Sequence, residues 1–378
     1  MNTTISDIAA VTSNFPDGQK LTGIQITFDQ EPESISRDRI SVPGKELNGM
    51  RQNGKILELS LKPERLIPPP KPRKTSPAPQ GNPNVPDMPP AVRLVPKAAV
   101  VLDGVSFETT RSIEPVVEDF RQMTLNGMHY NLYIPNLIPG EKYPLVLFIH
   151  DAGACGSDPK ITLSQGNGAV GFAAPEWQAE HPCFVLAPQI DKEPYGPMTS
   201  DDFKVTPDFD RLYDILMHVI REYPVDPRRI YTTGQSMGCM ASCELNIRHP
   251  DLFAASLLVA GQWDPEKMAE KCSSGQYWIL VSQGDAKAFP GMNAVTQAMA
   301  SAGAVVKTYF WDAKEDNLEQ LASLARQEQC NVHYTVFTDS SVVPDGVDPN
   351  PGMNHMCTWP AAYEIRELKK WMFSCVKK

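Results

Sequence analysis

Residues 234–238 read Gly-Gln-Ser-Met-Gly, and no other segment constrains the fold of this chain as strongly. The segment follows a β-branched and aromatic run at 229–233, typical of a buried strand, and precedes a run without Pro or Gly at 239–248, typical of a helix. A turn this tight holds its serine in sparsely populated φ/ψ space, so only small residues, here Gly234 and Gly238, fit two positions before it and two after it. The order predicts that Ser236 stands exposed at the end of a sheet, where it can act as a nucleophile.

Strand and helix patterns alternate from about residue 118 to the C-terminus. Residues 145–149 are continuously apolar, as in a strand buried on both faces. Further strand-like runs lie at 122–134, 183–187, 230–233, 255–260, 277–282 and 305–311, and helical patterns lie at 207–223, 237–248, 291–302 and 360–374. This alternation predicts an α/β domain with one mostly parallel, doubly wound sheet, and the serine turn makes it an α/β-hydrolase.

The first part of the chain has a different pattern. Alternating runs at 21–28 and 55–61 indicate antiparallel β structure, and β character resumes at 98–107. Between them, residues 63–97 are rich in proline, which is incompatible with regular helix or sheet and indicates a linker or long loop.

A chain of 378 residues is long enough for two domains. We therefore expect a smaller all-β domain at 1–115, including the proline-rich segment, and an α/β-hydrolase domain at 116–378.

A serine hydroxyl needs a base, and the base needs an orienting acid; in this fold they follow in the chain order Ser, Asp or Glu, His. Three histidines follow Ser236. His249 lies at the far end of the next helix, out of reach. His333 lies in a strand-like run and is expected to project from a sheet face. His355, in a glycine-containing loop expected before the final helix, is the predicted base.

The acid is expected at the carboxyl end of a core strand, where catalytic groups of α/β proteins collect. Asp285 follows the run at 277–282 and is the predicted acid. Asp264, after the preceding strand, is the second candidate, and Asp312 is the third. Asp264 also precedes Pro265, which is typical of a helix N-cap.

Two backbone N–H groups are needed to bind the oxyanion. Met237 begins the helix after the serine, so its N–H is one predicted donor, aided by the helix dipole. The loop at 150–156 follows the apolar strand and is rich in Gly and Ala. Ala152 is the predicted second donor, with Asp151 as the alternative, and His150 is expected to buttress the loop.

These features together carry a resemblance to a known family. Residues 147–153, 234–238, 246–255 and the run from His355 to 363 resemble α/β-hydrolase esterases related to polyhydroxybutyrate depolymerases, feruloyl esterases and predicted peptidases. Some of these proteins carry an N-terminal immunoglobulin-like domain, which residues 1–115 resemble by position and β pattern. The resemblance implies a carboxylic ester hydrolase with a catalytic triad.

The sequence departs from that family in two places. Asp151 stands where relatives usually have glycine, which affects the expected oxyanion geometry. Many relatives place the acid two residues beyond Asp285, where this chain has Lys287.

Composition limits the partners. A net charge of -10 and a pI near 5.3 argue against nucleic acid and anionic membranes as partners. Residues 1–7 lack the basic and apolar regions of a signal peptide, so we expect a cytoplasmic location, with a secreted protein whose leader has been removed as the alternative. The eight cysteines form no C-x-x-C pair or zinc pattern, which fits a reducing compartment.

We therefore expect a serine esterase that cleaves small, soluble short-acyl or aromatic esters through an acyl-enzyme on Ser236, without cofactor or metal. Four aromatic side chains flank the expected strand ends and are candidates for the pocket lining: Trp177, Trp263, Phe289 and Trp359. A serine peptidase of the same fold and a non-catalytic scaffold protein are the alternatives. The N-terminal domain is the candidate site for homo-oligomer formation.

Overall fold

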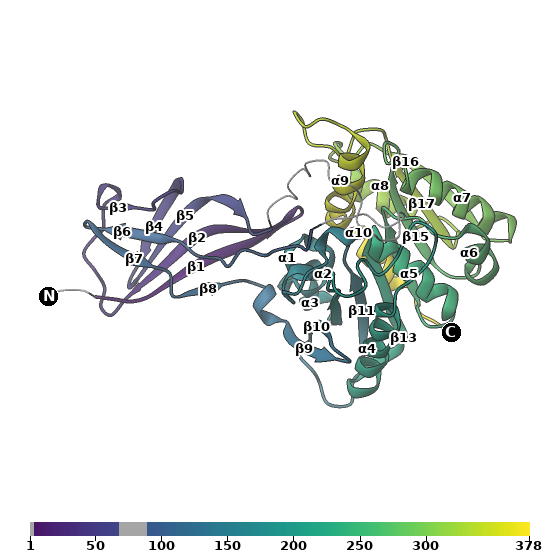
Figure 1. Cartoon of the computed structure of the whole chain (residues 1–378), viewed down its shortest axis with the longest axis horizontal. Coiled ribbons are helices and arrows are strands. Elements are labelled where there is room, and N and C mark those ends of the chain that lie inside the picture. Colours follow the sequence, from purple (N-terminus) through teal and green to yellow (C-terminus); the bar gives the residue numbers. More distant parts are fainter. Residues whose placement is uncertain (1–3, 68–88) are drawn as a thin grey trace.

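The computed structural model describes residues 4–67 and 89–378 and has two parts of different architecture (Figure 1). Strands up to residue 113 form an all-β lobe, here called the β lobe. Strands from residue 121 onward form a large sheet flanked by helices, here called the α/β lobe. Residues 68–88, most of the proline-rich segment, lie outside the described residues.

Two sheets enclose the core of the β lobe. One sheet has the strand order β4-β5-β2-β1-β8 and the other β3-β6-β7. Their bounds are β1 (Ile5–Phe15), β2 (Gly18–Phe28), β3 (Ile40–Ser41), β4 (Leu47–Asn53), β5 (Ile56–Arg65), β6 (Ala99–Leu102), β7 (Val105–Glu108) and β8 (Arg111–Ile113). Ile24, Leu57 and Val100 are buried between the sheets. The expected all-β architecture is confirmed, and the immunoglobulin-like type stays a prediction.

Nine strands form the sheet of the α/β lobe, in the order β16-β17-β15-β14-β13-β11-β12-β10-β9. Their bounds are β9 (Arg121–Leu125), β10 (Met128–Tyr133), β11 (Tyr143–Ile149), β12 (Phe184–Gln189), β13 (Val225–Gln235), β14 (Ala255–Val259), β15 (Tyr277–Ser282), β16 (Val306–Trp311) and β17 (Val332–Phe337). Neighbouring strands are parallel except at one edge, where β9 and β10 form an antiparallel hairpin and β10 pairs antiparallel with β12. The expected mostly parallel sheet of an α/β-hydrolase is confirmed.

Helices cover both faces of this sheet (Figure 1). They are α1 (Ile161–Ser164), α2 (Asn167–Ala173), α3 (Pro175–Glu180), α4 (Asp208–Glu222), α5 (Met237–Arg248), α6 (Pro265–Cys272), α7 (Ala288–Ser301), α8 (Leu318–Ala325), α9 (Pro351–Glu364) and α10 (Arg366–Ser374). Along β11, Val146 and Phe148 pack in one core, and Leu147 and Ile149 pack in the core on the other face. A strand buried on both sides therefore needs the continuous apolar run seen in the sequence.

The C-terminal helical region differs from the sequence prediction. A single helix was expected at 360–374, but α9 begins at Pro351 and α10 follows after a break at Ile365. The side chain of Asn350 accepts a hydrogen bond from the Met353 N–H at 3.0 Å and caps α9. An N-cap Asn followed by Pro at the first helical position is a helix-start signal, and it places His355 on a helix rather than in a loop.

Membrane crossing was also considered. Among the helices of residues 4–67 and 89–378, none combines the length and the apolar character that a bilayer span requires.

Candidate active site

Ser236 lies between the end of β13 and the start of α5, in a strained backbone conformation with φ 51° and ψ -116°. A Cβ atom at Gly238 would lie 1.9 Å from the carbonyl oxygen of Ile149, at the end of β11. A Cβ atom at Gly234 would lie 2.5 Å from the carbonyl carbon of Gly238. The backbones of the two strands and the helix are therefore in direct contact around the serine. The sequence predicted small residues at both positions, and the structure requires glycine.

Substituting Gly238 with alanine should lower both stability and activity. The added methyl group must displace Ile149, which precedes the loop at 150–156, and overpacking of this kind costs about 1–3 kcal/mol. Thermal unfolding and ester hydrolysis measure the two effects.

Gly171→Ala is the matched control, because a Cβ at this position in α2 would make ordinary contacts of 3.5 Å or more. Alanine is the better helix former by about 1 kcal/mol, so this variant should be as stable as the native protein or more stable. Equal stability of Gly238→Ala and the native protein would contradict the close approach.

Three predicted residues are joined by hydrogen bonds at the carboxyl edge of the sheet. His355, in the first turns of α9, places Nε2 2.9 Å from the Ser236 Oγ. Its Nδ1 lies 2.5 Å from Oδ2 of Asp285, which follows β15. The Asp285 side chain is only 3% exposed, whereas the His355 side chain is 26% exposed. The serine and the histidine can therefore be reached by a ligand, and the carboxylate is shielded behind them.

Asp285 is held by more than its bond to His355. Its Oδ1 accepts hydrogen bonds of 2.9 Å from the backbone N–H groups of Lys287 and Ala288, at the start of α7. Burial alone would raise the pKa of Asp285, but the bond to His355, the charge on that imidazole and the two N–H donors outweigh it and keep the pKa below its ordinary value. The group is therefore a fixed carboxylate at neutral pH.

The other candidate acids have different roles in the structure. Asp264 caps α6 by accepting from the N–H groups of Glu266 at 3.1 Å and Lys267 at 3.2 Å. The helix N-cap that the sequence indicated for this residue is thus confirmed. Asp312 accepts from the N–H of Lys314 at 2.9 Å in the turn after β16.

The other two histidines after the serine also lie elsewhere. His249 ends α5 and stacks on Tyr213, with ring centroids 4.1 Å apart. His333 lies on β17, as expected, and its Nδ1 is 3.2 Å from the hydroxyl of Tyr309. Burial lowers the pKa of His333 to about 4, so this imidazole is neutral at neutral pH.

His150 holds the loop after β11. It is fully buried; its Nδ1–H donates to the carbonyl oxygen of Asp151 at 2.7 Å, and its Nε2 accepts from the N–H of Ile190 at 2.9 Å. Burial lowers the pKa of His150, which keeps the ring neutral and suited to one donor and one acceptor bond. Because the peptide unit is planar, fixing the Asp151 carbonyl also fixes the direction of the Ala152 N–H. His150 therefore buttresses the loop, as expected.

A cavity of about 840 Å³ opens over Ser236 and His355. Ala152 and Met237, the predicted oxyanion donors, both line it. Much of the remaining lining is apolar, with side chains from Met240, Met353, Met356 and Trp359. Asp151 also lines the cavity, and its Oδ2 accepts from Nε2 of Gln235 at 3.1 Å. Asp151, a position where the family resemblance implied glycine, is thus part of the cavity lining.

The aromatic candidates for the pocket lining were mostly wrong. Trp359 lines the cavity and meets the His355 ring edge to face, at 5.3 Å between centroids. Trp177 and Trp263 are each 1% exposed in two separate hydrophobic cores, and Phe289 packs against the core that holds Trp263. The sequence analysis also missed five lining residues from the β lobe: Asp17, Gly18, Gln19, Arg65 and Ile67. No local motif marks these positions, since only the docking of the two lobes brings them to the site.

Comparison with known proteins identifies relatives of this chain. No protein-family model matches it. It is 29% identical over 229 residues to "Putative esterase NocK" of Nocardia uniformis subsp. tsuyamanensis; the match covers 58% of this chain and 63% of that protein, less than two thirds of its length. The crystal structure of a thermostable esterase matches 98% of this chain and all of its own, with a TM-score of 0.75 and 22% identity. The chain therefore has the α/β-hydrolase fold, and its resemblance to esterases of that fold is confirmed.

Proposed function

We propose that this protein is a serine esterase that hydrolyses carboxylic esters through an acyl-enzyme on Ser236. The observation that carries the proposal is the hydrogen-bonded series Ser236–His355–Asp285 at the carboxyl edge of the sheet. A strained serine with an imidazole on its hydroxyl and a buried carboxylate behind the imidazole is the arrangement that activates a hydroxyl for acyl transfer. The names of the two relatives support an ester as the substrate.

Each side chain has a defined role in the proposed reaction. As Oγ of Ser236 attacks the ester carbonyl carbon, Nε2 of His355 accepts the hydroxyl proton, and the carbonyl electron pair moves onto oxygen. Asp285 accepts the Nδ1–H of His355 and stabilises the imidazolium. The tetrahedral intermediate expels the alcohol, which takes the proton from Nε2 and leaves an acyl group on Oγ. Water then attacks this acyl group by the same steps and releases the acid.

The oxyanion is assigned to the N–H groups of Ala152 and Met237. Both residues line the cavity beside Ser236, and Met237 stands at the N-terminus of α5, where the helix dipole favours negative charge. The loss of one such donor lowers kcat by about 10²–10³. The bond from His150 that directs the Ala152 N–H supports this assignment.

The cavity lining indicates which esters fit. Methionine and tryptophan side chains around Ser236 suit an apolar or aromatic group, and methionine adapts to groups of different shape. The proposed substrates are therefore uncharged esters with a short acyl or aromatic group. An amide would require the same nucleophile, so a peptide library tested in parallel measures the peptidase alternative.

A fluorophosphonate probe and a chromogenic ester test the proposal together. We expect the probe to modify Ser236 at one label per chain, as measured by peptide mass spectrometry, and to abolish hydrolysis of p-nitrophenyl acetate. Ser200 lies in the same cavity, so Ser200→Ala is a matched control that should still be labelled at Ser236. A folded protein that is not labelled, or that hydrolyses peptides but no ester, would overturn the proposal.

A further inference from the structure

The cavity over Ser236 is built by both lobes. Asp17, Gly18 and Gln19, at the turn between β1 and β2, line it together with Arg65 at the end of β5 and the nearby Ile67. In Figure 1 the hairpin of β1 and β2 is the part of the β lobe that extends toward the helices of the α/β lobe. A ligand at Ser236 therefore shares its cavity with residues more than a hundred positions earlier in the chain.

The hairpin turn touches the α/β lobe through its backbone. Gly18 has φ 126°, and a Cβ there would lie 3.0 Å from the carbonyl oxygen of Ser164, the last residue of α1. Gly166, between α1 and α2, has φ 148°, and a Cβ there would lie 2.6 Å from the carbonyl oxygen of Pro16. Each lobe thus provides a glycine where the other lobe's backbone approaches, which leaves no room for a side chain between them.

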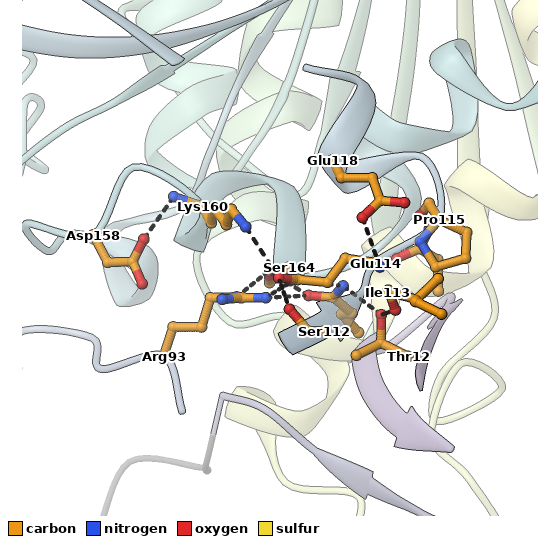
Figure 2. Close-up of polar contacts among 12 residues, drawn as sticks. Thr12, Arg93, Ser112, Ile113, Glu114, Pro115, Glu118, Asp158, Lys160 and Ser164 are labelled. Carbon is orange, nitrogen blue, oxygen red and sulfur yellow. Dashed lines mark hydrogen bonds and ion pairs between the residues drawn. The ribbon is translucent and has the colours of Figure 1, made fainter. Parts of the chain in front are cut away.

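A buried charge cluster fixes the same junction (Figure 2). Glu114, only 2% exposed, pairs with Arg93, with Nζ of Lys160 at 3.0 Å and with the Ser112 hydroxyl at 3.0 Å. Arg93 and Ser112 come from the β lobe, whereas Lys160 comes from the α/β lobe. Burial alone would raise the pKa of Glu114, but the charges of Arg93 and Lys160 and the hydrogen bonds keep it below its usual value.

Gln19 connects this cluster to the cavity. Its side chain is buried, and Oε1 accepts from the Ser164 hydroxyl at 2.8 Å and from Arg93 at 3.0 Å. Its Nε2 donates to the Thr12 hydroxyl at 2.9 Å and to Glu114 at 3.2 Å. Withdrawing the hairpin would break the bonds of Gln19 to Ser164, Arg93 and Glu114 and leave these buried polar groups with fewer partners, which is unfavourable. The turn is therefore a fixed wall of the cavity and not a lid.

The fixed wall faces the helix that carries the proposed base. Arg65 and Asp17 form an ion pair with each other. Both lie close enough to α9 for their charges to act on the pKa of the Cys357 thiol, which burial raises. Cys357 lines the same cavity as His355, so the wall bounds the ligand space that the reacting groups share.

We propose that this wall is a specificity-determining subsite: Ile67, with the turn at 17–19 and Arg65, limits the length of the acyl chain that the cavity accepts. The inference rests on the esterase function proposed above. Because the turn at 17–19 is fixed by buried contacts, an acyl chain that reaches it must stop or distort. The substrates are therefore uncharged esters of compact acyl groups, and the limit on length is set by the β lobe.

Two opposite substitutions at Ile67 test the wall. Ile67→Trp fills the cavity beside the wall and should lower kcat/KM for p-nitrophenyl octanoate about tenfold, the usual scale of overpacking. The kcat/KM for p-nitrophenyl acetate should change by less than about twofold, because the substitution leaves the catalytic groups as they are. Ile67→Ala enlarges the cavity and should raise the ratio of octanoate to acetate kcat/KM.

Val105→Trp is the matched control, since Val105 is 55% exposed on β7 of the same lobe and does not line the cavity. It should leave the ratio of the two esters unchanged. If the native protein hydrolyses both esters but the ratio of octanoate to acetate kcat/KM is the same in both Ile67 variants as in the native protein, the proposed subsite is wrong and the proposed function stands. If the native protein hydrolyses neither ester, the proposed function fails, and the wall fails with it.

Discussion

Replacing Ser236 with alanine should lower kcat for a chromogenic ester by about 10⁶, and replacing His355 with alanine should lower it by a similar factor. The reason is the single 2.9 Å bond between the Ser236 Oγ and Nε2 of His355. Without the imidazole, the hydroxyl keeps its proton and is a poor nucleophile. Without the hydroxyl, there is no nucleophile, and the imidazole has no hydroxyl proton to accept and pass to the leaving alcohol.

The double variant provides the sharper result. If the two side chains act as one unit, Ser236→Ala combined with His355→Ala should be no slower than either single variant. If the two side chains contributed independently, the factors by which the single substitutions lower kcat would multiply in the double variant. Ser200→Ala is the control within the same cavity and should keep nearly native kcat. Substantial activity in folded His355→Ala would show that another group is the base.

Much of this site could be predicted from sequence because its determinants are local. The crowding around Ser236 demands glycine at 234 and 238, and the β-branched run before it forms β13. The continuous apolar run of β11 shows burial on both faces. Chain order then restricted the base and acid to a few residues, and the structure places His355 and Asp285 together at Ser236.

The incorrect predictions have a physical explanation. Gly352 suggested a loop around His355, but the Asn350 cap and Pro351 start a helix that tolerates glycine in its first turn. Trp177 precedes one strand and Trp263 follows another, yet both are buried in hydrophobic cores, because burying a large ring is favourable wherever the packing allows it.

The contribution of the β lobe to the cavity could not be predicted for a different reason. Gln19 and Arg65 are ordinary polar residues in alternating strands, and nothing near them in the sequence indicates a ligand. Their position depends on the docking of two lobes through contacts between residues far apart, such as Gln19 with Ser164 and Lys160 with Glu114. Sequence periodicity describes each lobe and carries no information about their relative placement.

Replacing Asp285 with asparagine should lower kcat by about 10⁴ while the protein stays folded. The asparagine oxygen can still accept from the N–H groups of Lys287 and Ala288, so the turn before α7 is kept. Its amide, however, donates to Nδ1 of His355 and leaves the proton on Nε2, facing Ser236. That tautomer cannot accept the hydroxyl proton, and the imidazolium also loses the carboxylate that stabilises it.

Asp264→Asn is the matched control, and the pair of variants separates the two acids that the sequence left open. Asp264 caps α6 through the N–H groups of Glu266 and Lys267, and asparagine caps helices about as well as aspartate. Its kcat should therefore stay close to native. If kcat falls in Asp264→Asn and stays native in Asp285→Asn, the acid of the triad is Asp264. A fall in Asp285→Asn alone would show that the buried carboxylate bonded to His355 sets the tautomer on which proton transfer from Ser236 depends.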